Sequence, residues 1–148
     1  MTRRTRILVL NGPNLQRLGT RQPEVYGTLS LDDLRAQLGA AAEGVTWELR
    51  QTDDEAELVG WLHEAVDTGS HVIMNPAAFT HYSYALRDAA ALVTEAGLIL
   101  VEVHISNPYA REEFRHTSVI SGVATGVIAG FGFDSYLLAL RLVRDRSS

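Results

Sequence analysis

The segment Ile7-Leu-Val-Leu-Asn-Gly-Pro-Asn14 decides the fold. Its first four residues form an unbroken aliphatic run, which is typical of a strand buried on both faces of a parallel sheet. The next four residues are turn formers that end this strand. The pattern returns at Leu98-Ile-Leu-Val-Glu-Val-His-Ile105, where Asn107-Pro108 marks the end. Because ligands bind outside the carboxyl ends of parallel strands, the polar residues of both loops indicate a binding site.

Strand and helix patterns alternate along the rest of the chain. Short apolar runs predict five strands, at residues 7–10, 45–50, 72–74, 98–105 and 123–131. Helical spacing predicts helices from Ser30 onward and over residues 54–68, 83–95 and 135–144, with a short helical turn at 111–115. This order predicts an α/β, flavodoxin-like, three-layer fold with a five-stranded parallel sheet in the order 2-1-3-4-5. The 148 residues are expected to form a single domain, residues 1–148.

The composition excludes several classes of chemistry. All 13 basic residues are arginine, so neither a lysine imine nor a P-loop lysine is possible, and the absence of cysteine excludes thiolate nucleophiles and iron–sulfur clusters. The net charge of −5 argues against a nucleic-acid-binding protein, although the arginines of residues 1–21, where no acid occurs, indicate a local anion site. No apolar run could span a membrane, and no signal-peptide core follows the first arginines. We therefore expect a cytoplasmic protein.

The predicted strand order brings the polar loops together. The switch point lies between the first and third strands, whose following loops begin at Asn11 and Asn75, and His104 ends the neighbouring fourth strand. Glu102 lies two residues before His104, so both side chains face the same side of the sheet. A carboxylate beside an imidazole orients the ring and suits it to act as a general acid. The alternative is a purely structural pair at the end of a sheet.

A polar loop between Gly19 and Gly27 carries Arg21 and Tyr26. The flanking glycines indicate a hinged lid over the cleft. A tyrosine is almost entirely un-ionised at neutral pH, but a neighbouring guanidinium favours the phenolate. Tyr26 paired with Arg21 is therefore a candidate general base, and an ordinary surface loop is the alternative.

The remaining polar residues allow plainer interpretations. His81, Asp88 and His104 lack the spacing of a metal site, so we expect hydrogen-bonding roles for them and no metal. Arg111 and Arg115 lie four residues apart on the short helical turn and would project on one side, where they could hold a carboxylate. Pairing with the two glutamates between them is the alternative.

Taken together, these segments resemble the type II 3-dehydroquinate dehydratases over nearly the whole chain. The motifs that carry the resemblance are Asn11-Gly-Pro-Asn-Leu15, Gly19-Thr-Arg-Gln-Pro-Glu-Val-Tyr-Gly27, Asn75-Pro-Ala-Ala-Phe-Thr-His81, Ala85-Leu-Arg-Asp88, Glu102-Val-His-Ile-Ser-Asn107 and Arg111-Glu-Glu-Phe-Arg115. The resemblance implies a lyase of the shikimate pathway, which leads to chorismate and the aromatic amino acids. It implies dehydration of 3-dehydroquinate to 3-dehydroshikimate by an enolate-type anti elimination. The other class of this enzyme uses a lysine imine, which this chain cannot form.

The resemblance also implies a role for each matching residue. Tyr26 would remove a C2 proton with the help of Arg21, and Asn14 would hold a water that stabilises the enolate. His104, oriented by Glu102, would protonate the departing C1 hydroxyl. The residues implied to bind substrate are Asn75, His81, Ile105, Ser106 and Arg115.

The resemblance further implies a cofactor-free homododecamer built as four trimers, in which Asp88 reaches the site of a neighbouring subunit. No nucleic-acid or membrane partner is expected. Two other classes stay open from the residues themselves. A flavodoxin-like flavin or nucleotide binder would hold phosphate on the first loop, where Pro13 removes one amide donor. A non-catalytic assembly protein of the same fold would not depend on Tyr26.

Overall fold

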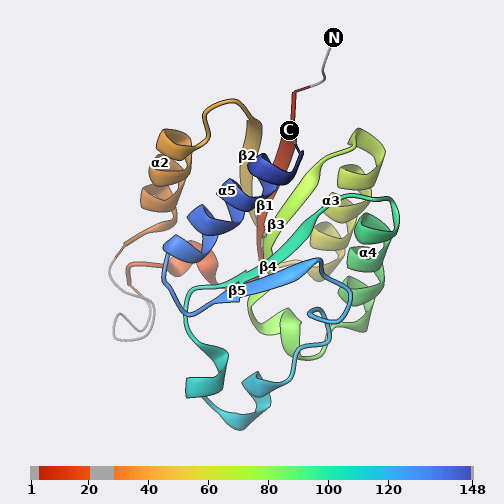
Figure 1. Cartoon of the computed structure of the whole chain (residues 1–148). Coiled ribbons are helices and arrows are strands. Elements are labelled where there is room, and N and C mark those ends of the chain that lie inside the picture. The colour runs from red at the N-terminus through yellow and green to blue at the C-terminus, as the bar shows by residue number, and fades with distance from the viewer. Residues whose placement is uncertain (1–3, 21–28, 148) are drawn as a thin grey trace.

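The computed structural model describes residues 4–20 and 29–147, and its strands form a parallel sheet (Figure 1). The strands are β1 (Arg6–Asn11), β2 (Thr46–Gln51), β3 (His71–Asn75), β4 (Leu100–His104) and β5 (Gly126–Ala129). Their order is β2-β1-β3-β4-β5. The α/β fold and the 2-1-3-4-5 order predicted from the sequence are therefore confirmed.

Helices cover both faces of the sheet. One face carries α2 (Leu31–Ala41) and α5 (Asp134–Ser147), and the other carries α3 (Glu55–Thr68) and α4 (Tyr84–Glu95) (Figure 1). Short 3-10 helices follow several strands: η1 (Leu15–Arg17), η2 (Ala77–His81), η3 (Pro108–Ala110) and η4 (Glu113–His116). This arrangement gives the three layers that the alternating sequence pattern predicts.

The helix ends follow from local sequence. The Ser30 hydroxyl accepts the Asp33 N–H while the Asp33 carboxylate accepts the Ser30 N–H, which is a capping box at the start of α2. Asp54 and Ser83 cap the starts of α3 and α4 through their side chains. Gly69 ends α3 in the left-handed conformation, with φ of 67°, which glycine adopts at little cost.

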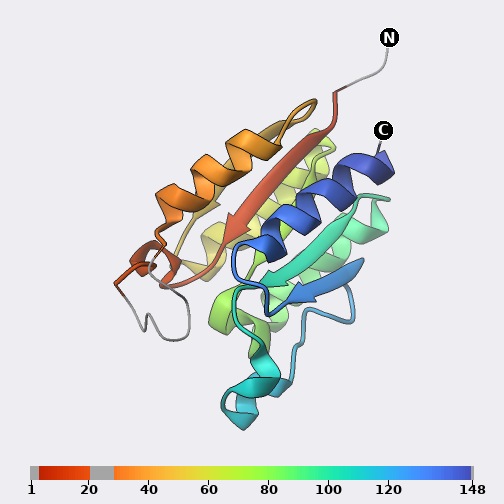
Figure 2. The same cartoon turned by 60° about the vertical axis from the view of Figure 1, so that its left-hand side comes forward.

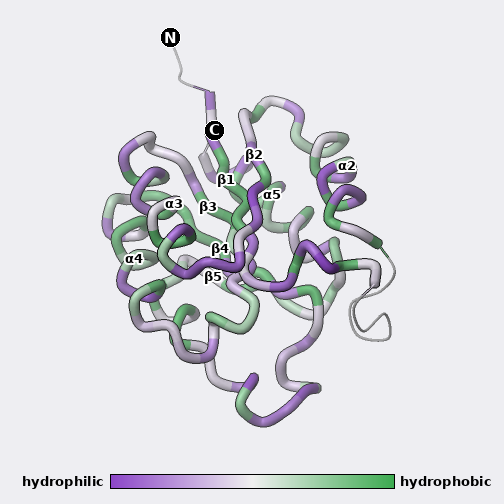
Figure 3. The backbone as a smooth tube through the Cα atoms, turned by 180° about the vertical axis from the view of Figure 1, so that it is seen from behind, coloured by the Kyte–Doolittle hydropathy of each residue, from purple (hydrophilic) through white to green (hydrophobic). Residues whose placement is uncertain are grey.

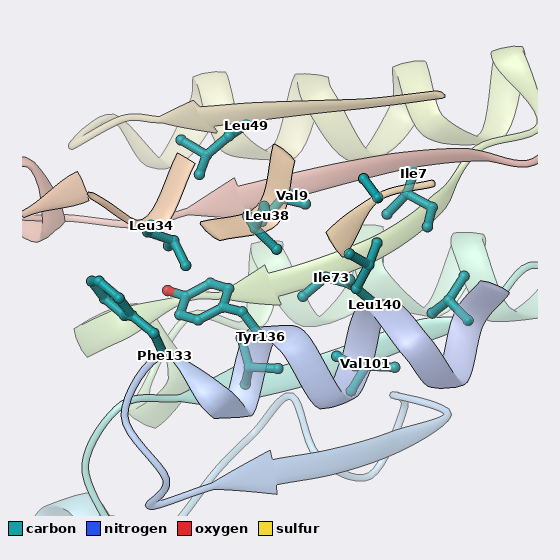
Figure 4. Packing of buried hydrophobic residues seen from close by; sticks show 14 of the residues in the cluster. Ile7, Val9, Leu34, Leu38, Leu49, Ile73, Val101, Phe133, Tyr136 and Leu140 are labelled. Carbon is teal, nitrogen blue, oxygen red and sulfur yellow. The ribbon is translucent and has the colours of Figure 1, made fainter. Parts of the chain in front are cut away.

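Alternate residues of each inner strand pack on opposite faces of the sheet. Ile7 and Val9 of β1 pack on the face of the sheet that α2 and α5 cover (Figure 4). Leu8 and Leu10 pack on the opposite face, which α3 and α4 cover. The central strands therefore bury apolar side chains on both faces, and hydrophobic residues run along their length (Figure 3). Each such buried leucine or isoleucine side chain contributes about 1.5–3 kcal/mol to the hydrophobic stabilisation.

The fourth strand is shorter than the predicted 98–105 and covers Leu100–His104, and two further segments differ more. The fifth strand is shorter than the predicted 123–131 and covers only Gly126–Ala129, because the residues before it form turns and Gly130 adopts a φ of 94°. The predicted helical turn at 111–115 is wrong as a single element. Arg111 is extended between η3 and η4, so Arg111 and Arg115 do not stand one turn apart on one helix.

The carboxyl ends of the strands meet at one edge of the sheet (Figure 2). The segments η1, η2 and η3 follow β1, β3 and β4 at this edge, and Asn11 lies beside Asn75 in the register of β1 and β3. Within the described part of the chain, no helix is both long enough and apolar enough to cross a membrane. The fold thus places the loop residues singled out above at one end of the molecule.

Candidate active site

A cavity opens at this edge, between the loops that follow β1, β3 and β4. Of the site residues predicted from the sequence, the structure brings seven together in its lining: Asn14, Asn75, His81, His104, Ile105, Ser106 and Arg115. Glu102 lies behind His104 and is 1% exposed. The lining also includes Arg111, which the sequence analysis named with Arg115 as able to hold a carboxylate, and Pro13 and Leu15, which had been given no ligand-binding role.

One predicted residue lies outside the cavity lining, and two others fall outside the described part of the chain. Asp88 is on α4, outside the cavity lining, where its exposed carboxylate accepts a hydrogen bond from Arg87 at 3.2 Å. Arg21 and Tyr26 fall in residues 21–28, outside the described residues. The lid prediction for the loop between Gly19 and Gly27 concerns the same segment.

The loop after β1 is held by contacts with the segments that follow β2 and β3. Gly12 N–H donates to the Asn75 carbonyl oxygen at 2.8 Å, and a Cβ atom at Gly12 would lie 2.4 Å from the carbonyl oxygen of Pro76. Asn14 adopts the left-handed conformation, with φ of 68°, and its N–H donates to the Asp53 carboxylate at 2.9 Å. Glycine at position 12 and asparagine at position 14 are thus the residue types that this backbone path accepts.

Backbone conformation marks the same two loops. Asn14 and Ala77 are the non-glycine residues with positive φ in the described ranges, at 68° and 53°. Both line the cavity. Sparsely populated backbone conformations persist where the surrounding structure enforces them, and they cluster at functional sites.

The contact between Glu102 and His104 predicted from the sequence is present. The Nε2 atom of His104 lies 2.5 Å from Oε2 of Glu102. Two hydroxyls that no sequence pattern indicates, those of Ser118 and Ser121, donate to the Glu102 carboxylate at 3.2 and 2.8 Å. The buried Glu102 therefore has three polar partners and fixes the imidazole ring of His104 in place.

His81 is held with a defined tautomer. Its Nδ1 lies 2.8 Å from the carbonyl oxygen of Thr117, an acceptor, so Nδ1 carries the proton. Burial lowers the pKa of His81, and this outweighs the opposing effect of the bond to Thr117. The ring is therefore neutral near pH 7, and Nε2 is left as an acceptor for a ligand hydroxyl.

Arginines make one side of the cavity positive. Arg115 donates from Nε to Glu112, and its guanidinium lies over the Phe114 ring at 4.8 Å from the ring centroid. Arg111 Nη1 approaches the Ser106 hydroxyl at 3.5 Å. These contacts hold both guanidinium groups at the cavity, where planar groups with several N–H donors suit a carboxylate. Across residues 4–20 and 29–147, no cluster of three or more His, Cys, Asp or Glu could hold a metal ion.

The chain is similar to known proteins over most of its length. The sequence model of the family Dehydroquinase class II matches residues 5–144. A 3-dehydroquinate dehydratase of Salinispora tropica is 58% identical over 144 residues, which cover 96% of this chain and 99% of the relative. One from Mycobacteroides abscessus is 57% identical over 137 residues, 91% of this chain and 93% of the relative.

A solved structure shows the same architecture. The crystal structure of a type II dehydroquinase from Propionibacterium acnes superposes with a TM-score of 0.91 at 49% identity, covering 95% of this chain and 97% of that one. Both the sequence and the fold thus match over nearly the full length, as the resemblance of the motifs predicts. The chain belongs to the class II dehydroquinase family.

Proposed function

We propose that this protein is a 3-dehydroquinate dehydratase of the shikimate pathway, a lyase that converts 3-dehydroquinate to 3-dehydroshikimate and water. The observation that carries the proposal is the family match over residues 5–144, in a chain whose motif residues line one cavity. The 148 residues then act as a single catalytic domain and need no cofactor.

The reaction begins with proton removal. Tyr26 takes a proton from C2 of the substrate, and the electron pair moves toward the adjacent ketone to form an enolate. Arg21 assists by favouring the phenolate of Tyr26. These two roles rest on the resemblance of the segment Gly19–Gly27 to the family motif.

The enolate oxygen needs a donor that is in place before charge develops. Asn14 serves this role through a water that it holds. Two observations support this role for Asn14. The residue lines the cavity, and its backbone N–H is bound to the Asp53 carboxylate. A donor held in this way loses little free energy to reorganisation during the reaction.

Protonation of the leaving group completes the elimination. His104 gives a proton to the C1 hydroxyl, the C1–O bond breaks, water departs and the enolate electron pair forms the C1–C2 double bond. Since Nε2 is bound to Glu102, Nδ1 is the nitrogen from which we expect the proton to pass. Acid and base then act on opposite faces of the substrate, as an anti elimination requires.

Substrate hydroxyls and the carboxylate are bound by the rest of the lining: Asn75, His81, Ile105, Ser106 and Arg115. Arg115 supplies a positive charge for the carboxylate. The neutral His81 accepts a hydroxyl hydrogen at Nε2. Ile105 has no polar side-chain atom, so its contact is through the main chain.

The assembly is proposed from the resemblance alone. Four trimers would form a homododecamer in the cytoplasm, and Asp88 would reach the site of a neighbouring subunit. Its carboxylate is exposed on α4 rather than turned into the cavity of its own subunit, which is the placement such a contact needs.

The activity is tested by incubating the purified protein with 3-dehydroquinate and following the product by proton NMR. A vinyl proton signal of 3-dehydroshikimate that grows in proportion to protein concentration is the expected result. Unchanged substrate in the presence of folded protein would contradict the proposal. A yellow protein that releases flavin on denaturation would favour the flavin-binding alternative.

A further inference from the structure

Tyr136 joins the two loops that build the candidate site. It lies in the first turn of α5, its ring is fully buried, and it packs edge-on against Phe133 at 6.3 Å between centroids. In Figure 4 its hydroxyl points toward the carboxyl ends of β1 and β3. A buried tyrosine hydroxyl needs hydrogen-bond partners, and this one has two.

Both partners are asparagines at strand ends. The Tyr136 hydroxyl donates to Oδ1 of Asn11 at 2.7 Å and accepts from Nδ2 of Asn75 at 2.9 Å. Asn11 Nδ2 in turn donates to the Arg50 carbonyl oxygen at 3.1 Å, and Asn75 Oδ1 accepts the Ala77 N–H at 3.1 Å. All three side chains are at least 95% buried, since Asn75, the most accessible of them, is 4% exposed.

The chemistry of the end groups fixes the direction of every bond in this network. The Arg50 carbonyl can only accept, so Asn11 presents its nitrogen there and its oxygen to Tyr136. The single hydroxyl hydrogen of Tyr136 is then used, so Asn75 must offer it an N–H. From the other end, the Ala77 N–H can only donate, so Asn75 presents its oxygen to Ala77. The two ends therefore require the same orientation of the Asn75 amide.

This orientation decides what Asn75 offers to a ligand. One hydrogen of Nδ2 is bound to Tyr136, and one lone pair of Oδ1 is bound to Ala77. The second hydrogen of Nδ2 is the donor left for the cavity that Asn75 lines. Burial raises the pKa of Tyr136, so the hydroxyl keeps the hydrogen on which the arrangement depends.

We infer that Tyr136 is a positioning residue: it holds the Asn75 amide with Nδ2 at the ligand and keeps the loops after β1 and β3 at a fixed separation. The inference rests on the proposed function, in which Asn75 binds a substrate hydroxyl. Without the Tyr136 hydroxyl, the Asn75 side chain is held by Ala77 alone. A donor with one anchor instead of two is less well placed for binding.

The test compares Tyr136→Phe, which keeps the ring, with Ser70→Ala. Ser70 is 1% exposed, and its hydroxyl bonds only to Thr68 at 2.8 Å in the described structure, at the opposite end of β3. Both variants lose one buried hydroxyl. For Tyr136→Phe we expect KM for 3-dehydroquinate to rise about tenfold while kcat changes by less than about twofold. For Ser70→Ala we expect both constants to stay at the wild-type values.

Two outcomes would overturn the inference. One is a Tyr136→Phe enzyme with wild-type KM and kcat and only a lower Tm, which would make Tyr136 a structural residue. The other would be seen by comparing ligand-free crystal structures of the wild type and of Tyr136→Phe. If the Asn75 side chain has the same position and orientation in both, the inference is wrong. The crystallographic comparison stands even if wild-type protein fails to turn over 3-dehydroquinate, a result that would count against the proposed function instead.

Discussion

The backbone at Gly12 passes so close to Pro76 that a Cβ atom at position 12 would lie 2.4 Å from the Pro76 carbonyl oxygen. Gly12 follows β1 and Pro76 follows β3, so this contact joins the two loops at the switch point of the sheet. The Gly12 N–H bond to the Asn75 carbonyl, at 2.8 Å, reinforces it. The separation of Asn14 and Asn75 across the cavity depends on this close approach.

Gly12→Ala is expected to push the two loops apart. The obstacle is backbone and not a flexible side chain, so we expect a loss of about 2–3 kcal/mol in the free energy of unfolding and a large fall in kcat/KM. Denaturant unfolding and steady-state kinetics measure both effects. The matched control is Gly60→Ala in α3, where a Cβ atom meets nothing within 4 Å. There we expect unchanged kinetics and a gain of up to about 1 kcal/mol from helix propensity.

Glu102→Gln is expected to impair the acid without unfolding the protein. The amide keeps the shape of the carboxylate but loses the charge that orients and supports His104, so kcat should fall about 100-fold. Circular dichroism and kcat are the measurements. Glu95→Gln, at the exposed end of α4, should leave kcat unchanged. Wild-type kcat in Glu102→Gln would show that the pair at 2.5 Å is structural.

Tyr26→Phe separates catalysis from assembly. The variant lacks the proposed base, so we expect turnover to fall by at least about 100-fold while the oligomeric state stays that of the wild type. Light scattering reports the second property on the same sample. Full activity of Tyr26→Phe would remove Tyr26 from the mechanism. A changed oligomer would show instead that the loop serves assembly.

Stability should fall as the pH decreases through the range of histidine titration. The Nδ1 atom of His71 accepts the Ile99 N–H at 3.0 Å, and burial lowers the pKa of this histidine. The unfolded chain therefore binds a proton that the folded chain does not, at pH values below about 6.5. The expected result is a free energy of unfolding that declines as the pH falls below about 6.5, the ordinary histidine pKa.

Two variants test whether His71 causes this decline in stability. In His71→Asn the side-chain oxygen can accept the Ile99 N–H without titrating, so the decline should become smaller. His63→Gln, at an exposed position of α3, should keep the wild-type pH dependence. Urea unfolding at a series of pH values is the measurement. Equal slopes for wild type and His71→Asn would contradict the account.

Much of this architecture was predictable from the sequence because the signals are local. The run Ile7–Leu10 and the turn residues after it give a buried strand and a loop without reference to the rest of the chain. The spacing of Glu102 and His104 was enough to predict their contact. The glycine-rich stretch around β5 has no comparable pattern, and its strand is accordingly shorter than predicted.

The residues missed are those whose roles depend on distant contacts. Ser118 and Ser121 reach Glu102 only because the chain returns beside β4, and nothing in their own neighbourhood indicates it. Tyr136 occupies an apolar position of a predicted helix, where packing alone would explain it. Its hydroxyl was the available signal, since a tyrosine at a buried helical position requires a polar partner.

The most direct test of the central claim is an ultraviolet assay of the protein in the presence of a metal chelator and, separately, after treatment with borohydride. Dehydration of 3-dehydroquinate creates a conjugated enone, so absorbance reports the reaction as it proceeds. We predict that the absorbance rises at the same rate with and without a metal chelator. We also predict an unchanged rate when the mixture of protein and substrate is first treated with borohydride and fresh substrate is then added. Inactivation by borohydride or by the chelator, or a flat trace from folded protein, would contradict a dehydratase that works through Tyr26, His104 and an enolate.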